Sequence, residues 1–223
     1  MDIANAGLVL ENLFNDFHTL NVPNVRPIHN LQELRQVYQL THECYVSTGH
    51  FRAHPSQMIV HYPNFDHIPE TEILVAVMDG VIVGSVSVTF DGPAGFTVEE
   101  EFKEQCAVIR EEGVPMAAVW RLVVADSVRA NRAVLMSLVD TVVTRIRKRD
   151  IPLALFAVNP KHERVYCHLL NMEVVARKLQ TDGRSAPSVL LRADAHKIPV
   201  RREAHHGGLV YNPIRALLST TAF

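Results

Sequence analysis

The pattern of apolar and polar residues predicts a strand, a helix, a strand and a second helix in succession between Pro115 and Met172. The first strand, Ala117 to Ala125, is apolar except for Arg121, which is typical of a strand covered on both faces. A second apolar run, Leu153 to Val158, predicts the next buried strand. Because such a unit joins parallel strands through a crossover helix, ligands are expected near their carboxyl ends. The helix between them carries one broad apolar face, formed by Val134, Leu135, Leu138, Val139, Val142, Val143 and Ile146.

Antiparallel strand pairs are predicted on either side of this central unit. Two alternating runs, Glu72 to Met78 and Val81 to Phe90, flank Asp79-Gly80, which is a strong hairpin signal. The other expected elements are strands at 25–29, 173–179 and 188–193, a turn at 180–186, and helices at 31–49 and 98–112. We therefore expect an α/β (α+β) fold in which helices cover both faces of a mixed, mostly antiparallel, twisted sheet.

Three segments are expected along the chain. Residues 1–24 form an N-terminal amphipathic helix and linker, residues 25–196 form one globular domain, and residues 197–223 form a tail that can dock on it. The N-terminal helix is expected to pack on the domain, with a mobile lid or a surface for lipid or a partner as the alternative. Its polar face carries no Lys or Arg, so membrane contact through residues 1–20 is not favoured.

Composition and charge narrow the class of protein. The 223 residues are 48% apolar and 21% charged, as in soluble globular proteins, and a net charge of −2 gives no indication of nucleic acid as a partner. Twelve histidines are scattered without metal-ligand spacing, so no metal site is predicted. Cys44, Cys106 and Cys167 lie within apolar patterns, which indicates buried thiols in a reducing compartment. With no membrane-spanning segment or secretion signal, a cytoplasmic protein is expected.

Residues 51–68 are predicted to form a long loop, FRAHPSQMIVHYPNFDHI. Loops of this length in a compact domain are often functional, and an insertion without function is the alternative. In the strand after the next turn, Ser85, Ser87 and Thr89 alternate with apolar residues. One face of that strand is therefore expected to be wet or to line a pocket.

The order of elements resembles that of the GNAT acyltransferase superfamily. The second helix of the central unit runs from Asn159 through Tyr166 to Asn171-Met172, where the superfamily pattern ends in Gly-Phe. Over roughly Val25 to Ala195, the chain more closely resembles the long-chain N-acyl amino acid synthases, which are relatives of the acyl-homoserine lactone synthases. The resemblance is carried by the ordered set of LQELRQVYQLTHECYV, NFDHIPETEILVAVMDGVIVGSVSVTFDGPAGF, AAVWRLVV, FAVNPKHERVYCHLLNM and the strand APSVLL.

This resemblance implies transfer of a long-chain acyl group from an acyl carrier protein thioester to the α-amine of a small amino acid, with no bound cofactor. The superfamily holds coenzyme A diphosphate on R/Q-x-x-G-x-G/A, but here Arg132 and Val134 stand at the glycine positions. Side chains there obstruct close approach of a diphosphate, which favours carrier-bound phosphopantetheine over acyl-CoA. Arg129 and Arg132 are then candidates for its phosphate or for the acidic carrier; two solvated arginines are the alternative.

The resemblance also places the donors that stabilise the thioester oxyanion on the first central strand. They would be backbone N–H groups near Leu122, Val123 or Val124, next to a bulge, so no polar side chain is required. Arg121 would bind the carboxylate of the amino acid. The alternative is that Arg121 pairs with a buried acid such as Asp66. In the expected fold the two central strands part at Val123 and Asn159, and the thioester enters between them.

Proton transfer has several candidates. Related synthases often carry a glutamate three residues before the arginine, but this chain has Ala118 there. Glu43 and Asp66 are the remaining candidates for proton removal; a peptide α-amine has a pKa of about 8, so positioning matters more than a strong base. Tyr166 stands at the thiol-protonating position of the superfamily, or is simply an aromatic residue of the core. Asn159 binds the pantetheine amides or caps the following helix.

A long acyl chain needs an apolar channel, since each buried methylene contributes about 0.8 kcal/mol. Candidate walls, for each of which ordinary core packing is the alternative, are Phe96, Phe102, Trp120, Leu122 and Phe156. The acids that homoserine lactone synthases carry before the aspartate are His61 and Pro63 here, which argues against a lactone product. Two other functions stay open: a coenzyme A-dependent GNAT acetyltransferase, and a non-catalytic module that binds acyl groups or partners.

Overall fold

The computed structural model describes residues 22–49, 51–179, 187–198 and 200. The predicted N-terminal helix, the turn at 180–186 and most of the predicted tail lie outside these residues, so the division into three segments stays a prediction. The strands are β1 (Asn24–Pro27), β2 (Thr71–Met78), β3 (Val81–Phe90), β4 (Met116–Val124), β5 (Leu153–Val158), β6 (Glu173–Lys178) and β7 (Ser188–Asp194). The helices are α2 (Leu31–Ser47), α3 (Glu99–Arg110), α4 (Arg132–Arg147) and α5 (Glu163–Leu169), with short turns η1 (Asp126–Val128) and η2 (Pro160–His162).

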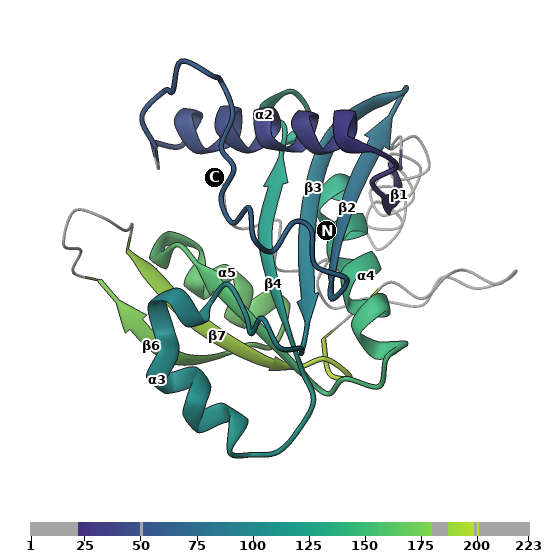
Figure 1. The fold of residues 1–223 in the computed structure, drawn as a ribbon. Helices are drawn as coiled ribbons and strands as arrows, with labels where there is room; N and C mark the ends of the chain where they lie inside the picture. Colours follow the sequence, from purple (N-terminus) through teal and green to yellow (C-terminus); the bar gives the residue numbers. More distant parts are fainter. Residues whose placement is uncertain (1–21, 50, 180–186, 199, 201–223) are drawn as a thin grey trace, which may run out of the picture.

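The strands form one seven-stranded sheet in the order β1-β2-β3-β4-β5-β7-β6 (Figure 1). β4 and β5 pair in parallel, and every other neighbouring pair is antiparallel. The expected mixed, mostly antiparallel sheet is therefore confirmed. None of the described helices combines the length and apolar character that crossing a membrane requires.

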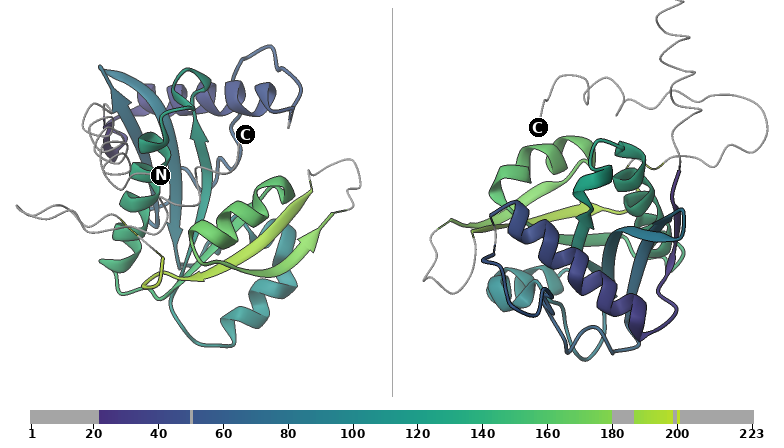
Figure 2. Two further views of the ribbon diagram at one scale, coloured as in Figure 1. Left: turned by 180° about the vertical axis from the view of Figure 1, so that it is seen from behind. Right: turned by 90° about the horizontal axis from the view of Figure 1, so that it is seen from above.

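Helices cover both faces of the sheet (Figure 2). α4 and α5 pack on one face, over a core that includes Leu74, Val86, Leu138, Val142 and Leu191. On the other face α2 packs over Val75 and α3 packs over Leu155. For α4, the face predicted from apolar periodicity is buried; its buried residues include Val134, Leu138, Val139, Val142, Val143 and Ile146.

Close packing of α4 on the sheet depends on Gly84 in β3. A Cβ atom at this position would lie 2.9 Å from Leu138 Cδ1 and 3.2 Å from both Val134 Cγ1 and the Val123 carbonyl oxygen. Since interiors are packed almost without spare volume, only glycine fits here without displacement. Gly84 thus sets the distance between α4 and the strand next to β4.

The side chain of Asn30 caps the N-terminus of α2. The Asn30 side chain accepts hydrogen bonds from the N–H groups of Gln32 and Glu33, at 2.9 and 3.0 Å. Glu33 in turn accepts from the His29 N–H at 2.8 Å, one residue before the position of a standard capping box. The cap fixes the residue at which α2 begins.

α3 differs from the uninterrupted helix predicted over residues 98–112. Phe102 has non-helical backbone angles, φ −130° and ψ 40°, which interrupt the helix after its first turn. The Phe102 side chain is 3% exposed and packs with Phe96, Leu155 and Leu190. Apolar spacing predicted the buried face of α3 but not this interruption.

β4 and β5 separate before either strand ends. Their pairing runs from Met116–Leu153 to Val119–Phe156, although β4 continues to Val124 and β5 to Val158. The other edge of β5 stays paired with β7 as far as Val158. The strands were expected to part at Val123 and Asn159, and they do so earlier, directly after Val119 and Phe156.

A β-bulge accompanies this separation. Ser87 pairs with Trp120 but Ser85 pairs with Val123, so two residues of β4, Arg121 and Leu122, lie opposite one residue of β3. Arg121 has a positive φ of 51°, which is uncommon for a residue with a side chain. The bulge expected near Leu122 to Val124 is therefore present and is centred on Arg121.

Candidate active site

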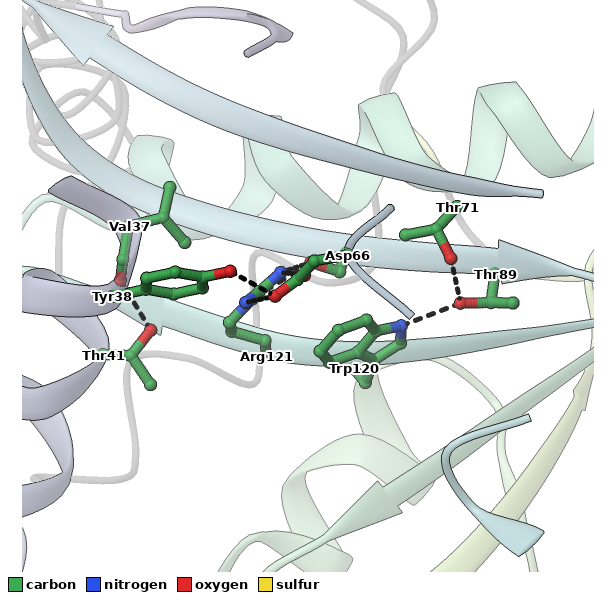
Figure 3. Close-up of polar contacts among 9 residues, drawn as sticks. Val37, Tyr38, Thr41, Asp66, Thr71, Thr89, Trp120 and Arg121 are labelled. Carbon is green, nitrogen blue, oxygen red and sulfur yellow. Dashed lines mark hydrogen bonds and ion pairs between the residues drawn. The ribbon is translucent and has the colours of Figure 1, made fainter. Parts of the chain in front are cut away.

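Two polar residues of β3, Ser87 and Thr89, take part in buried hydrogen bonds, whereas the buried Ser85 Oγ has no partner among the described residues. Thr89 Oγ1 accepts from Trp120 Nε1 at 3.0 Å and lies 2.8 Å from Thr71 Oγ1, as Figure 3 shows. Ser87 Oγ accepts from Arg121, with Nη2 at 2.9 Å and Nε at 3.2 Å. Side chains of β2 and β4 therefore cover Ser87 and Thr89, on the face of β3 that was expected to be wet or to line a pocket.

Arg121 and Asp66 form an ion pair whose two side chains are 0% exposed. Arg121 Nη1 donates to Asp66 Oδ2 at 3.2 Å, and Nη2 makes a second, shorter contact with Oδ1. The Tyr38 hydroxyl donates to the same carboxylate at 2.7 Å, and burial together with Asp66 raises the pKa of Tyr38 (Figure 3). The pairing left open from the sequence is thus the arrangement in the structure.

This ion pair connects the bulge to the loop and to α2. The guanidinium carbon of Arg121 lies 4.4 Å from the Trp120 ring centroid, so a ring covers it as well. The carboxylate of Asp66 is committed to hydrogen bonds from Arg121 and Tyr38. The geometry supports a positioning role for Asp66 and Arg121, while direct contact of either with an amino acid stays a prediction.

Aromatic side chains continue from this ion pair towards the end of α2. Tyr62 contacts Trp120 edge to face, with ring centroids 5.4 Å apart, and His61 lies 4.2 Å from Tyr62. Tyr45 of α2 meets the His61 ring at 5.9 Å and stacks on Phe51 at 5.6 Å. We call Tyr45, Phe51, His61, Tyr62 and Trp120 the aromatic wall.

Within the aromatic wall, His61 has a pKa below the ordinary value for histidine. Burial lowers the pKa of its imidazole to about 4; the charge of Arg121 lowers it further and that of Asp66 opposes the change. Its Nδ1 atom is buried and has no hydrogen-bond partner within the described ranges. The ring is therefore neutral at physiological pH.

Tyr166 of α5 lies on the other side of the opening. Burial raises the pKa of Tyr166 to about 12, and the nearby Tyr45 adds to the effect. α2 and α5 cover opposite faces of the sheet, so Tyr45 and Tyr166 come within electrostatic range where β4 and β5 have parted. Its hydroxyl is therefore protonated at neutral pH, as that of an ordinary tyrosine is.

A carboxylate from α3 borders the same region. Glu101 accepts a short hydrogen bond from the Ser188 hydroxyl, at the start of β7. The next residue of β7, Val189, pairs with Val158 at the end of β5. Glu101 is also the nearest charge that, after burial, raises the pKa of Tyr62. Position 118 in β4 is an alanine, and on this face of the sheet α3 supplies a carboxylate instead, that of Glu101.

The N-terminus of α4 follows β4 at the expected phosphate position. Arg132 is its first residue and is exposed, and Arg129 is exposed and forms an ion pair with Asp126. Val134 is 0% exposed because its side chain points into the core against Gly84. The expected obstruction by Val134 is therefore absent, and Arg132 is the side chain that stands at this helix end.

The remaining predicted residues are dispersed. Glu43 is exposed on α2, and its side chain makes no hydrogen bond or ion pair with another described residue. Asn159 Oδ1 accepts from the Lys161 N–H at 3.0 Å, which is the capping role left open from the sequence. Of the predicted channel walls, Phe156 is 5% exposed and packs in the core, whereas Leu122 is half-buried at the opening. The walls Phe96, Phe102 and Trp120 are 1%, 3% and 6% exposed.

Sequence reasoning did not single out Tyr45, Tyr62 or Glu101, and it mentioned His61 only as a departure from related synthases. Tyr45 looks like one more residue on the apolar side of α2, and Glu101 looks like helix-end charge. Their proximity depends on how the loop folds back over β4, which local patterns do not encode. The one local signal was the density of aromatic residues between 51 and 68.

A comparison with protein families identifies a match over residues 36–194, more than half of the chain, to the model described as N-acyl amino acid synthase FeeM. No curated protein sequence matches the chain significantly.

Solved structures share the fold. FeeM, an N-acyl amino acid synthase from uncultured soil microbes, superposes with a TM-score of 0.66 at 21% identity, covering 79% of this chain and 93% of that one. BjaI, described as a CoA-dependent acyl-homoserine lactone synthase, has a TM-score of 0.58 at 17% identity, covering 81% and 84%. A GNAT-family acetyltransferase from Staphylococcus aureus has a TM-score of 0.53 at 10% identity, covering 77% and 98%.

Proposed function

Because the chain belongs to the FeeM family of N-acyl amino acid synthases, we propose that it joins a long-chain acyl group, carried as a thioester on an acyl carrier protein, to the α-amine of an amino acid. Membership of the family shows that the chain is an N-acyltransferase. The proposal adds the acyl carrier protein as donor, the long acyl chain and the amino acid as acceptor. The observation that carries the proposal is the parting of β4 and β5 directly at the bulge.

The thioester lies in the space between the parted strands. Beyond Val119, the edge of β4 that faces β5 has no hydrogen bonds from that strand. Backbone polar groups need partners, and N–H groups around Leu122 to Val124 are positioned to bind the thioester oxygen. Their bonds strengthen as negative charge develops on that oxygen during attack.

The acyl chain follows the same opening. Leu122, Val124 and Val158 are half-buried and Ala157 is exposed, so these apolar side chains border the parted ends. Each methylene that they cover contributes about 0.8 kcal/mol to binding, and a long chain is therefore held more strongly than an acetyl group. The fully buried phenylalanines of the core are not required as walls.

Charge at α4 fits the phosphate of a phosphopantetheine arm. Arg132 stands exposed at the N-terminus of a helix, where backbone N–H groups and the helix dipole also favour anions. Arg129 is close by in the sequence and forms an ion pair with Asp126. The basic residues at the other end of α4 have structural partners: Arg147 donates to the carbonyls of residues 195, 196 and 198, and Arg149 pairs with Glu72.

The reaction forms one bond and breaks another. The neutral amine attacks the thioester carbon, the C–N bond forms, and the C–S bond then breaks. Tyr166 supplies the proton that the leaving thiolate takes up, because its hydroxyl stays protonated and lies beside the opening. Arg121 and Asp66 act by holding the bulge in place.

The test is product formation from defined donors. Palmitoyl-acyl carrier protein, palmitoyl-CoA and acetyl-CoA are each incubated with the protein and an equimolar mixture of the proteinogenic amino acids, and products are identified by mass spectrometry. We expect an N-palmitoyl amino acid, formed fastest from the carrier protein. Thiol release from acetyl-CoA alone would instead favour the acetyltransferase function.

The carrier is tested separately by Arg132→Ser, with Arg35→Ser on exposed α2 as a matched loss of charge. Arg132→Ser should raise the KM for the carrier-bound donor about tenfold and leave the KM for the amino acid unchanged. Arg35→Ser should change neither. Equal effects of both variants would show that Arg132 contributes only to overall charge.

A further inference from the structure

His61 has a buried nitrogen that the described part of the protein leaves unsatisfied. The Nδ1 atom is sealed from solvent and has no hydrogen-bond partner among the described residues. A buried polar atom without a partner costs about 1–3 kcal/mol, and native structures usually provide one from protein, water or ligand. The position therefore calls for a partner from outside the described residues.

The His61 ring lies beside both ends of the proposed reaction site. Tyr45, whose ring meets His61 at 5.9 Å, is the residue that comes within electrostatic range of Tyr166 through the opening. On the other side, Arg121 at the bulge is close enough to lower the pKa of His61. His61 thus stands between the strand that binds the thioester oxygen and the tyrosine that protonates the thiolate.

We propose that Nδ1 of His61 binds the amine nitrogen of the acceptor and takes the proton that this nitrogen loses as the amide bond forms. This inference rests on the proposed function and assigns a catalytic residue to its acceptor side. The other candidates are less suited: Asp66 is committed to Arg121 and Tyr38, and Glu43 is exposed without a contact to the site.

The proton balance is as follows. An α-amine has a pKa of about 8, so a minority is neutral at pH 7 and can attack without prior help. Once the C–N bond forms, the nitrogen becomes a strong acid, and the Nδ1 lone pair accepts one proton from it. The sulfur leaves with a proton from Tyr166. Once the product has left, water that enters the site takes the proton from His61 and returns one to Tyr166.

The surroundings keep the lone pair available between turnovers. Burial and Arg121 disfavour the protonated imidazole, Asp66 partly offsets them, and the adjacent Tyr45 and Tyr62 stay neutral because their pKa values are raised. A hydrogen bond from the amine also gives Nδ1 the partner that it lacks among the described residues. Binding of the correct nitrogen is thereby favoured over binding of an apolar group.

The test compares two substitutions of His61 with one of His67, an exposed histidine on the same loop. His61→Phe keeps a ring in the aromatic wall but removes the acceptor, and kcat should fall about 100-fold or more with the KM for the thioester unchanged. His61→Asn offers an amide oxygen in place of Nδ1; it should keep the KM for the amino acid near that of wild type while kcat stays low. His67→Asn should match wild type.

The pH dependence separates catalysis from packing. Protonation of the amine slows both enzymes alike as the pH falls, so the ratio of the wild-type kcat to the His61→Phe kcat should decline towards pH 4, where the imidazole is protonated. A His61→Phe enzyme with wild-type kcat, or one whose loss is accounted for by a lower Tm and a raised KM for the thioester, overturns the proposal.

Failure of the proposed function would look different. A wild-type protein that forms no N-acyl product from any donor counts against the function itself, whatever His61 does. In that case the ¹⁵N resonance of His61 Nδ1 is followed while the amino acid mixture is added at pH 7. A shift supports the assigned contact, and an unchanged resonance at saturating concentration overturns it.

Discussion

At the scale of single residues, the contact between Arg121 and Asp66 has the largest expected effect on stability. Removing one partner of a buried ion pair leaves an uncompensated charge, so Asp66→Ala should lower the free energy of unfolding by about 3–5 kcal/mol. Tyr38→Phe removes only one hydrogen bond to the carboxylate and should cost about 1.5–3 kcal/mol. Urea unfolding monitored by circular dichroism measures both.

The double variant Asp66→Leu/Arg121→Met is the control for this interpretation. Replacing both charges by apolar side chains leaves no buried ion, so the double variant should be more stable than Asp66→Ala alone. A double variant no more stable than Asp66→Ala would contradict this interpretation.

His61 predicts a pH dependence of stability. Its folded-state pKa of about 4 lies below the ordinary value of 6.5, so the unfolded chain binds a proton first as the pH falls. Stability should therefore decrease between pH 6.5 and pH 4, by up to about 3 kcal/mol at 1.36 kcal/mol for each pKa unit. His61→Phe should show a correspondingly smaller decrease, as measured by Tm across this range; parallel curves would contradict the prediction.

Single residues were predictable where the signal is local. Asn30 could be identified as a helix cap because capping involves the next three residues. Asp66 could be proposed as a partner for Arg121 because a charge within an apolar strand needs a counterion. The position of His61 could not be predicted, since it depends on Tyr45 and Tyr62 meeting through a loop without regular secondary structure.

At the scale of elements, the fit between α4 and β3 should be sensitive to one methyl group. Gly84→Ala places a Cβ atom 2.9 Å from Leu138 Cδ1 and should lower the free energy of unfolding by about 1–3 kcal/mol. Adding Leu138→Val to Gly84→Ala should recover part of this loss by removing the nearest contact. Thermal unfolding of the two variants tests the order; no recovery would point to the Val123 carbonyl as the main obstacle.

Helices and strands followed the predicted boundaries closely because their apolar periods are regular. The two irregular features were harder. Apolar spacing is insensitive to the non-helical angles of Phe102, which keeps its buried position. The sequence did not reveal which residue lies at the centre of the bulge either. A positive φ is usually found at glycine, whereas the residue with positive φ in this strand is Arg121.

At the scale of the whole molecule, four residue pairs join β4 to β5. A non-hydrolysable palmitoyl thioester analogue on carrier protein should slow amide hydrogen exchange at Leu122 to Val124 and at Ala157 to Asn159, because ligand and backbone become hydrogen-bonded there. Exchange at Ala117 to Val119, which are already paired, should change little. Mass spectrometry of peptic fragments measures both, and uniform protection across the sheet would place the ligand elsewhere.

The whole-molecule architecture was predictable in outline. The alternation of strands and helices indicated a mixed sheet, and the family resemblance supplied the parting of the central strands. Apolar runs alone could not have shown that parting, because Leu122 to Val124 would be equally apolar in a continuous sheet. The side chains that border the opening come from distant parts of the chain, and only the assembled fold brings them together.

The positive φ of Arg121 has one more consequence. The backbone at this position would accept glycine with less strain, by about 1–2 kcal/mol, yet the arginine side chain is what reaches Asp66, 55 residues earlier in the chain. The loop thus holds in place the strand that it covers. Exchanging this loop between relatives would reshape the opening itself unless the incoming segment brings an acid to the same spot, so grafts designed to alter substrate choice should preserve that anchor first.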